Sequence, residues 1–162
     1  MNLADFCAEL DSQLENCSPE GRISLSVRML SKVFKIPAGD IAVFLVVPEE
    51  EMLRFAWPEK LQSSGTIPLN AKKSLVAKTL REERGYLDNR FAQAAHGVVF
   101  EAFSGGSPVQ KILSAPMVID GVAKGVVQVS RKAQEHKDAG ADFSPTELAA
   151  LEKMAAIIGQ HI

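Results

Sequence analysis

Residues 111–132 read KILSAPMVI-DG-VAKGVVQVSRK, and this stretch decides the fold. Its two halves, residues 111–119 and 122–132, are rich in valine and isoleucine and are joined by Asp120-Gly121. An Asp-Gly pair favours a type I′ turn, because both central positions of that turn need positive φ angles. The stretch therefore predicts an antiparallel β-hairpin.

Four further segments upstream of the hairpin have strand character. Residues 41–47 (IAVFLVV) form an uninterrupted apolar run, which predicts a central strand buried on both faces. Residues 52–57 follow a Glu-rich turn and predict its partner in a second hairpin. Residues 65–69 predict a short strand at a sheet edge, because Pro68 cannot donate a ladder hydrogen bond. Residues 86–89 predict a short extended piece.

The remaining segments carry apolar residues at helical spacings of three and four. Ser144 to Glu147 reads as a capping box with proline in the first turn, so the last helix is predicted to begin there. Gly85 is predicted to end an earlier helix in the left-handed conformation. Hairpins dominate the order of elements, so the sheet should be antiparallel with helices on its faces. The predicted helices comprise two within residues 1–35, then residues 74–84, 91–103 and 144–162.

Composition excludes several classes of function. The chain has 162 residues, 46% of them apolar, and its net charge of −2 comes without a basic stripe, which argues against nucleic-acid binding. No apolar run approaches the roughly 20 residues that a membrane span needs, and the N-terminus lacks a signal-peptide pattern. Only two cysteines occur, Cys7 and Cys17, and they are too far apart on one helix to form a disulfide. A cytoplasmic location is expected.

Several short motifs, taken in order, resemble the pattern of GAF domains, the small-molecule-sensing relatives of the PAS fold. They are residues 67–69 (IPL), 112–117 (ILSAPM), Gly121, 125–129 (GVVQV) and Phe143 before the last helix. The resemblance covers roughly residues 41–151 and implies one domain over residues 1–162. It implies an α+β fold with a central antiparallel sheet of five to six strands, whose N- and C-terminal helices pack together on one face. The terminal helices then fall in residues 1–35 and 144–162, and the sheet and pocket helices in residues 40–132.

The resemblance also implies a ligand pocket between the 111–132 hairpin and the helix at residues 91–103. GAF domains bind cyclic nucleotides, tetrapyrroles, small metabolites or metals, and some bind nothing. Gln128 and Ser130 share one face of their strand, as a pocket wall or as a solvent-exposed stripe. His96 is the one histidine in this region, either a ligand or an ordinary side chain. The predicted pocket residues are Phe91, His96, Phe100, Ser114, Met117, Gln128 and Ser130.

The known ligand signatures of the family are incomplete here. Of the cyclic-nucleotide pattern, Lys132 and Phe143 match, whereas Arg131, Glu147 and Leu148 depart from it. The two cysteines lie on the first helix, away from the pocket region, which argues against bilin attachment and against the thiol-dependent methionine sulfoxide reductases of this fold. No catalytic constellation and no metal-ligand spacing is visible, so the ligand and any cofactor stay unknown.

These observations predict a non-enzymatic sensory or regulatory domain that binds a small molecule and relays binding through a dimer or a signalling partner. The alternative is a ligand-free module for dimerisation or protein interaction. Heptad-like seams on both terminal helices favour a homodimer, although each seam can equally pack within its own subunit. The seam residues are Leu3, Cys7, Leu10 and Leu14, and Leu148, Leu151, Ala155, Ile158 and Ile162.

Overall fold

The sheet of the protein is antiparallel and has six strands, as expected from the sequence. The computed structural model describes residues 2–63, 66–93 and 107–162. Along the sheet the strand order is β3-β2-β1-β6-β5-β4, so the long hairpin lies beside the apolar strand at residues 41–47. The strands are β1 (Ile41–Val47), β2 (Met52–Trp57), β3 (Thr66–Pro68), β4 (Tyr86–Asp88), β5 (Val109–Ile119) and β6 (Val122–Lys132).

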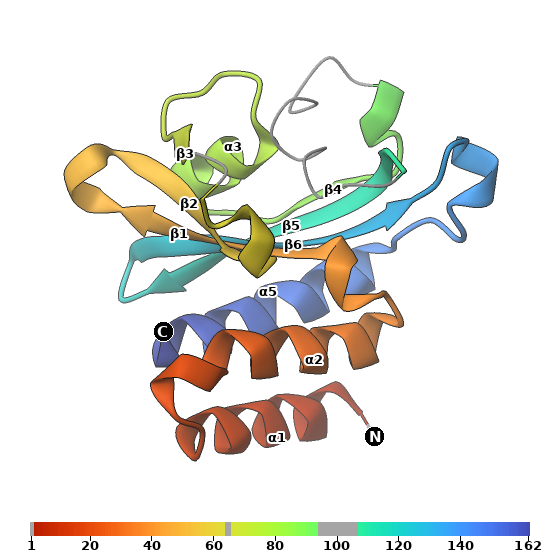
Figure 1. The fold of residues 1–162 in the computed structure, drawn as a ribbon. Coiled ribbons are helices and arrows are strands. Elements are labelled where there is room, and N and C mark those ends of the chain that lie inside the picture. Colours follow the sequence, from red (N-terminus) through yellow and green to blue (C-terminus); the bar gives the residue numbers. More distant parts are fainter. Residues whose placement is uncertain (1, 64–65, 94–106) are drawn as a thin grey trace.

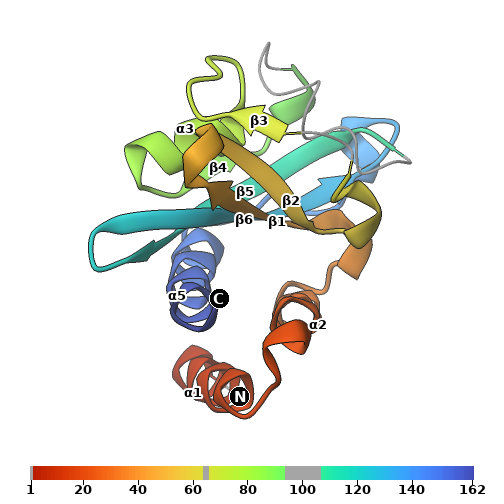
Figure 2. The same ribbon diagram turned by 60° about the vertical axis from the view of Figure 1, so that its left-hand side comes forward.

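Helices cover both faces of this sheet (Figure 1). On one face lie α2 (Arg22–Phe34) and α5 (Pro145–His161), with α1 (Leu3–Glu15) outside them and away from the sheet (Figure 2). On the other face lies α3 (Leu75–Glu82). The described 3₁₀ turns are η1 (Pro19–Gly21), η2 (Ala38–Asp40), η3 (Pro48–Glu50), η4 (Glu59–Leu61), η5 (Phe91–Gln93) and η7 (His136–Asp138).

The β5–β6 hairpin has the turn that its sequence predicts. Asp120 and Gly121 both adopt positive φ angles, 52° and 78°. The register slips by one residue between Met117 and Val118, which places a bulge beside Gly125. Gly125 lies against the backbone of β1, where a Cβ atom would come within 2.1 Å of the Phe44 carbonyl oxygen. Only glycine permits this close approach of two strands.

The two faces of the sheet bury separate apolar clusters. The larger cluster joins the sheet to α2 and α5 and includes Leu113, Met117, Val127, Leu151 and Met154. The smaller cluster lies under α3 and includes the rings of Phe44 and Phe55, whose centroids are 4.5 Å apart. Strand alternation produces this division, since successive side chains point to opposite faces.

The helix termini confirm one prediction and correct another. At α5, the Ser144 side chain accepts from the Glu147 amide and the Glu147 side chain accepts from the Ser144 amide, which confirms the capping box. The predicted left-handed residue after α3 is wrong: Glu83, with φ 52°, takes that conformation rather than Gly85. Gly85 lies against the side chains of α5 instead, where a Cβ would meet Glu152 at 2.9 Å. No described helix is long and apolar enough to cross a membrane.

The apolar seams of the terminal helices pack largely inside one chain. Leu10 and Leu14 of α1 are fully buried in the same cluster as Leu151 and Ile158 of α5. The seams therefore pack within their own subunit, as one of the two sequence-based interpretations expected. The α1 seam, however, packs against other helices and not against the sheet. The seams therefore no longer support a homodimer, and that partner stays a prediction.

Candidate functional site

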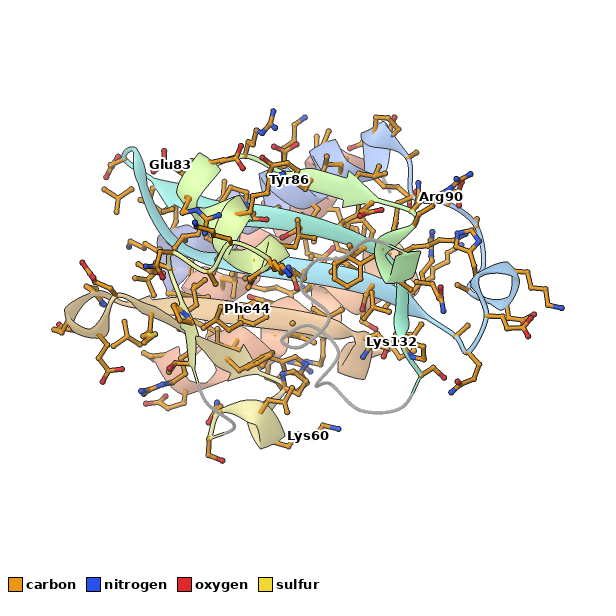
Figure 3. All side chains as sticks on the ribbon, turned by 90° about the horizontal axis from the view of Figure 1, so that it is seen from above. Phe44, Lys60, Glu83, Tyr86, Arg90 and Lys132 are labelled. Atoms are coloured by element: carbon orange, nitrogen blue, oxygen red, sulfur yellow. The ribbon has the colours of Figure 1, made fainter. Side chains whose placement is uncertain are left out.

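A row of polar side chains lies on the α3 side of β6. Gln128, Ser130 and Lys132 occupy every second position of the strand, so they share one face. Gln128 and Ser130 are buried, with 3% and 6% of each residue exposed, and the Lys132 side chain is 7% exposed. Figure 3 looks down on this face of the sheet and labels Lys132 and Phe44 there. Buried polar groups on an apolar face distinguish binding sites from ordinary sheet surface.

These polar groups line a small hollow with apolar side walls. Phe44 and Phe55 form part of the wall, and Val109 and Ile112 of β5 form another part. Asp40, at the end of η2, lies at the same hollow. The cavity volume is about 20 Å³, which is room for about one water molecule. A larger ligand therefore requires the walls to move apart.

A chain of hydrogen bonds connects the hollow to α3. The Gln128 amide nitrogen Nε2 donates to Ser114 Oγ at 3.1 Å. Ser114 Oγ and Thr79 Oγ1 share a hydrogen bond of 2.7 Å, and Thr79 Oγ1 also donates to the Leu75 carbonyl at 2.8 Å. No donor among the described residues pairs with Gln128 Oε1. Gln128 is one of the residues that line the hollow, and a side-chain amide oxygen is a hydrogen-bond acceptor.

The other end of the row is tied to η2. Ser130 Oγ donates to the Asp40 carbonyl at 2.9 Å, and Lys132 Nζ lies 3.2 Å from Asp40 Oδ1. The Lys132–Asp40 ion pair is almost entirely buried on the lysine side. Its positive charge is therefore held close to the hollow, beside the Asp40 carboxylate.

Four of the seven predicted pocket residues come together on this face. Ser114, Gln128 and Ser130 lie on neighbouring positions of β5 and β6, and Phe91 packs on Val109 and Ile112 beside them. His96 and Phe100 lie outside the described residues, as does most of the predicted helix at residues 91–103, of which the described part, residues 91–93, is a 3₁₀ turn.

Met117 corrects the prediction, because the structure places it on the opposite face of the sheet. It is fully buried against α5, where its Cβ lies 3.0 Å from the position of a Cβ at Gly159. Successive side chains of a strand point to opposite faces of the sheet. Because Met117 is three residues from Ser114, an odd number, the two side chains lie on opposite faces. Sequence reasoning also missed Thr79 and Asp40. Thr79 could have been recognised in the sequence, because its hydroxyl group lies among the apolar residues of a short helix.

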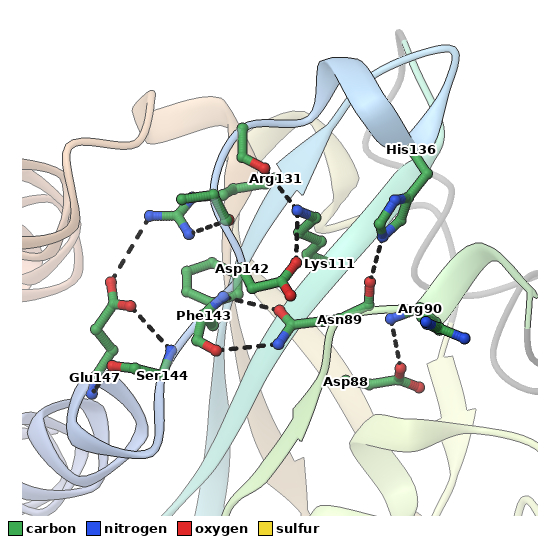
Figure 4. A network of polar contacts seen from close by, with 12 residues as sticks. Asp88, Asn89, Arg90, Lys111, Arg131, His136, Asp142, Phe143, Ser144 and Glu147 are labelled. Atoms are coloured by element: carbon green, nitrogen blue, oxygen red, sulfur yellow. Dashed lines mark hydrogen bonds and ion pairs between the residues drawn. The ribbon is translucent and has the colours of Figure 1, made fainter.

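A second polar network fixes the segment before α5 to the sheet (Figure 4). The Asn89 side chain accepts from the Phe143 amide at 2.8 Å and donates to the Phe143 carbonyl at 3.0 Å. Arg131 packs over the Phe143 ring at 4.1 Å and lies 3.7 Å from Glu147 of the capping box. His136 contacts the Asn89 carbonyl at 2.8 Å. The network joins Asn89, directly after β4, to the first turn of α5.

Within this network, Lys111 holds the pKa of Asp142 below its usual value. The buried Lys111 ammonium donates to Asp142 Oδ1 at 2.8 Å and to the Gly140 carbonyl at 2.6 Å. The hydrogen bond from Lys111 to the carboxylate is the main cause of the lowered pKa. The pair therefore stabilises the fold above the pKa of the unfolded chain, and this contribution is lost as the pH falls through the lower folded pKa.

We expect this pair to produce a pH-dependent difference between the wild type and Asp142→Asn. Above about pH 5 the wild type should unfold at the higher temperature, because its carboxylate is ionised in both states. Below about pH 4 the difference should shrink, because the wild-type carboxylate becomes protonated. Melting temperatures from circular dichroism between pH 7 and pH 2 measure this. A difference that stays constant down to pH 2 would contradict the assigned pairing.

The cysteines lie away from the hollow. Both thiols are free and half-buried in the helical layer, and burial raises the pKa of Cys7. A raised pKa keeps the thiol protonated and unreactive at neutral pH. Among residues 2–63, 66–93 and 107–162, no group of three His, Cys, Asp or Glu side chains is placed to hold a metal ion.

Comparison with known proteins gives matches to solved structures. No protein-family model matches the sequence, and no curated protein matches it significantly. The GAF domain of a phosphoenolpyruvate-protein phosphotransferase from Coxiella burnetii superposes with a TM-score of 0.78 at 12% identity, over 99% of this chain and 92% of that chain. The corresponding Acinetobacter domain gives 0.76 at 14% identity, over 99% and 93%.

A third similar structure is an enzyme, the free methionine-R-sulfoxide reductase from Neisseria meningitidis in complex with its substrate. It superposes with a TM-score of 0.68 at 14% identity, over 98% of this chain and 87% of that chain. Together with the sheet order and the terminal helices, these matches show that the chain has the α+β fold of a GAF domain. The motif-based prediction of this fold is confirmed.

Proposed function

We propose that the chain is a non-enzymatic regulatory domain of the cytoplasm that binds a small molecule on the α3 side of its sheet. One observation carries the proposal: the largely buried side chains of Gln128, Ser130 and Lys132 line a hollow with apolar walls. A few placed polar groups among apolar side chains are the usual composition of a small-molecule site. The ligand would enter as the walls separate and would hydrogen-bond to Gln128 Oε1.

Two observations support a binding role over a catalytic one. The similar reductase acts on a sulfoxide, but both cysteines of this chain lie in the helical layer across the sheet from the hollow. The described hollow holds no nucleophile with an oriented base, since Ser130 donates to a backbone carbonyl and Ser114 shares its hydrogen bond with Thr79. Among the described residues of the hollow, none can therefore be assigned a catalytic role.

The relay of binding would run through the first turn of α5. Arg131 lies between the hollow-lining residues Ser130 and Lys132, but it points to the other face and contacts Phe143 and Glu147. A shift of β6 at the hollow would therefore displace the start of α5. A signalling partner or a second copy of the chain that contacts the terminal helices would receive this change.

The alternative function is a ligand-free dimerisation module, and two observations favour it. The hollow is nearly filled, and an apolar groove of about 370 Å³ opens between the ends of α1, α2 and α5. Its apolar lining is Leu3, Phe6, Val33, Phe34 and Ala150. If a second copy of the chain binds in this groove, the wild type should be a dimer in sedimentation analysis. The variant Phe6→Glu, which places a charge in the groove, should then be a monomer. A wild type that stays monomeric at high concentration would eliminate this alternative.

A thermal-shift screen of small metabolites tests the binding proposal. A true ligand should raise the melting temperature of the wild type, and its affinity for Gln128→Leu should be about tenfold weaker through the lost hydrogen bond. Leucine has similar volume, and Ser114 keeps its bond to Thr79, so the variant should fold. Gln13→Leu on α1, remote from the hollow, is the matched control and should bind as the wild type does. Equal affinity of all three proteins would refute the site.

A further inference from the structure

A second concavity, separate from the hollow, lies between the start of α3 and the edge strand β4. Its volume is about 330 Å³, in the range of small-molecule sites. Three lysines line it, Lys72 and Lys73 before α3 and Lys78 one turn into it. Figure 3 shows Tyr86, which forms part of the β4 side, lying at the edge of the sheet. We call this concavity the lysine groove; its other lining residues are Ser74, Leu75, Leu87 and Asp88.

The three lysines of the lysine groove form no ion pair within the described part of the chain. Within the described part of the chain, no carboxylate lies within 4 Å of the amino groups of Lys72, Lys73 or Lys78. By contrast, Lys111 and Lys132 each pair with an aspartate. Three like charges around one concavity repel each other, and an anion between them removes that cost. The arrangement is notable in a chain whose net charge is −2.

Asp88 is the one acidic residue among the groove's lining residues, and its side chain is held by a local hydrogen bond. Asp88 Oδ1 accepts a hydrogen bond from the Arg90 amide at 2.8 Å. The Lys78 side chain is held by a cation–π contact, with its amino group 4.7 Å from the centroid of the Tyr86 ring. Arg84 donates to the Tyr86 hydroxyl at 2.8 Å, contacts the same ring at 4.7 Å and lies 3.8 Å from the Glu82 carboxylate.

The loop that carries two of the lysines is held in place. Arg81 of α3 donates to the carbonyls of Leu69 and Ala71, at 2.8 Å and 3.0 Å. The Ser74 side chain, fully buried, then accepts from the Ala77 amide and fixes the start of the helix. The lysine backbone positions are therefore set before any ligand arrives, which lowers the entropic cost of binding.

We propose that the lysine groove binds the phosphate groups of a small phosphorylated molecule. Lysine ammonium groups are compact charges with three donors each, and they suit phosphate oxygens. The positive end of α3 adds to the same field. The site goes beyond the proposed function and is independent of it, because the groove and the hollow lie on either side of an apolar cluster formed by Leu75, Tyr86, Phe91, Val109 and Ile112.

Isothermal titration calorimetry of the whole protein with inorganic pyrophosphate tests the proposal, with sulfate as a second titrant at the same ionic strength. The wild type should bind pyrophosphate saturably and more tightly than sulfate. The double variant Lys72→Ser/Lys73→Ser should bind about tenfold more weakly or worse, through the loss of two charged donors. Both lysines are exposed, so the variant should fold normally, which circular dichroism checks.

The matched control is Lys60→Ser/Lys124→Ser, which removes two exposed lysines elsewhere on the surface. It should bind pyrophosphate within about twofold of the wild type, as should Gln128→Leu, which separates this site from the hollow. The proposal is overturned if the wild type shows no saturable binding or if sulfate binds equally well. An equal loss in the control variant would likewise overturn it, since binding would then follow net charge alone.

Discussion

Gly125→Ala is expected to destabilise the protein by at least about 3 kcal/mol. A Cβ atom at this position would lie 2.1 Å from the Phe44 carbonyl oxygen and 2.6 Å from Met117 Cε. The first contact is with backbone of the neighbouring strand, so no side-chain rotation relieves it. Relief requires β1 and β6 to separate, which breaks the ladder between Leu45 and Gly125 and loosens packing on both faces of the sheet.

Equilibrium unfolding in urea measures this loss, with two other glycines as references. Gly39→Ala should lie within about 0.5 kcal/mol of the wild type, because nothing lies within 4 Å of the added atom. Gly121→Ala should cost about 1 kcal/mol, because φ is 78° there and the cost is backbone strain alone. Gly125→Ala falling within 1 kcal/mol of the wild type would show that the two strands are not held this close.

Asn89→Ala is expected to cost about 2–4 kcal/mol, the second-largest effect. The Asn89 side chain satisfies both the amide and the carbonyl of Phe143, whose side chain is buried in the main core. Alanine leaves both backbone groups without these partners, and each unsatisfied buried group costs free energy. The loss should also free the segment before α5, so its amides should exchange hydrogen faster.

Asn89→Asp is the matched variant for this prediction. Its carboxylate still accepts from the Phe143 amide but no longer donates to the Phe143 carbonyl, so about half of the loss is expected. Urea unfolding gives the free energies, and hydrogen exchange of residues 139–147 gives the local effect. Faster exchange spread evenly over the whole chain would contradict a local clamp between β4 and α5.

Local chemistry made most of the fold predictable. The Asp120-Gly121 pair specified the hairpin turn, and Ser144 with Glu147 specified the start of α5. Pro68 placed β3 at a sheet edge, which the strand order confirms. The left-handed residue after α3 was predicted at the wrong position, because packing of Gly85 against α5 uses the glycine for space and leaves Glu83 to make the turn.

The site was predictable only in part, since it depends on contacts far apart in the chain. Alternation correctly grouped Gln128 with Ser130, but the placement of Met117 with Ser114 ignored the same rule. Thr79 joins the network through a partner 35 residues away, and Asp40 through one 90 residues away. No local pattern specifies such pairs, so the sequence identified one wall of the hollow and left the others open.

Native mass spectrometry tests the central claim, the binding of a small molecule on the α3 side of the sheet, most directly. The wild type and Gln128→Leu are each equilibrated with a protein-free metabolite extract, desalted and weighed intact. We predict a discrete added mass on the wild type that is strongly reduced on Gln128→Leu and retained on Gln13→Leu. A wild type that carries no added mass, or the same added mass on all three proteins, would contradict the claim.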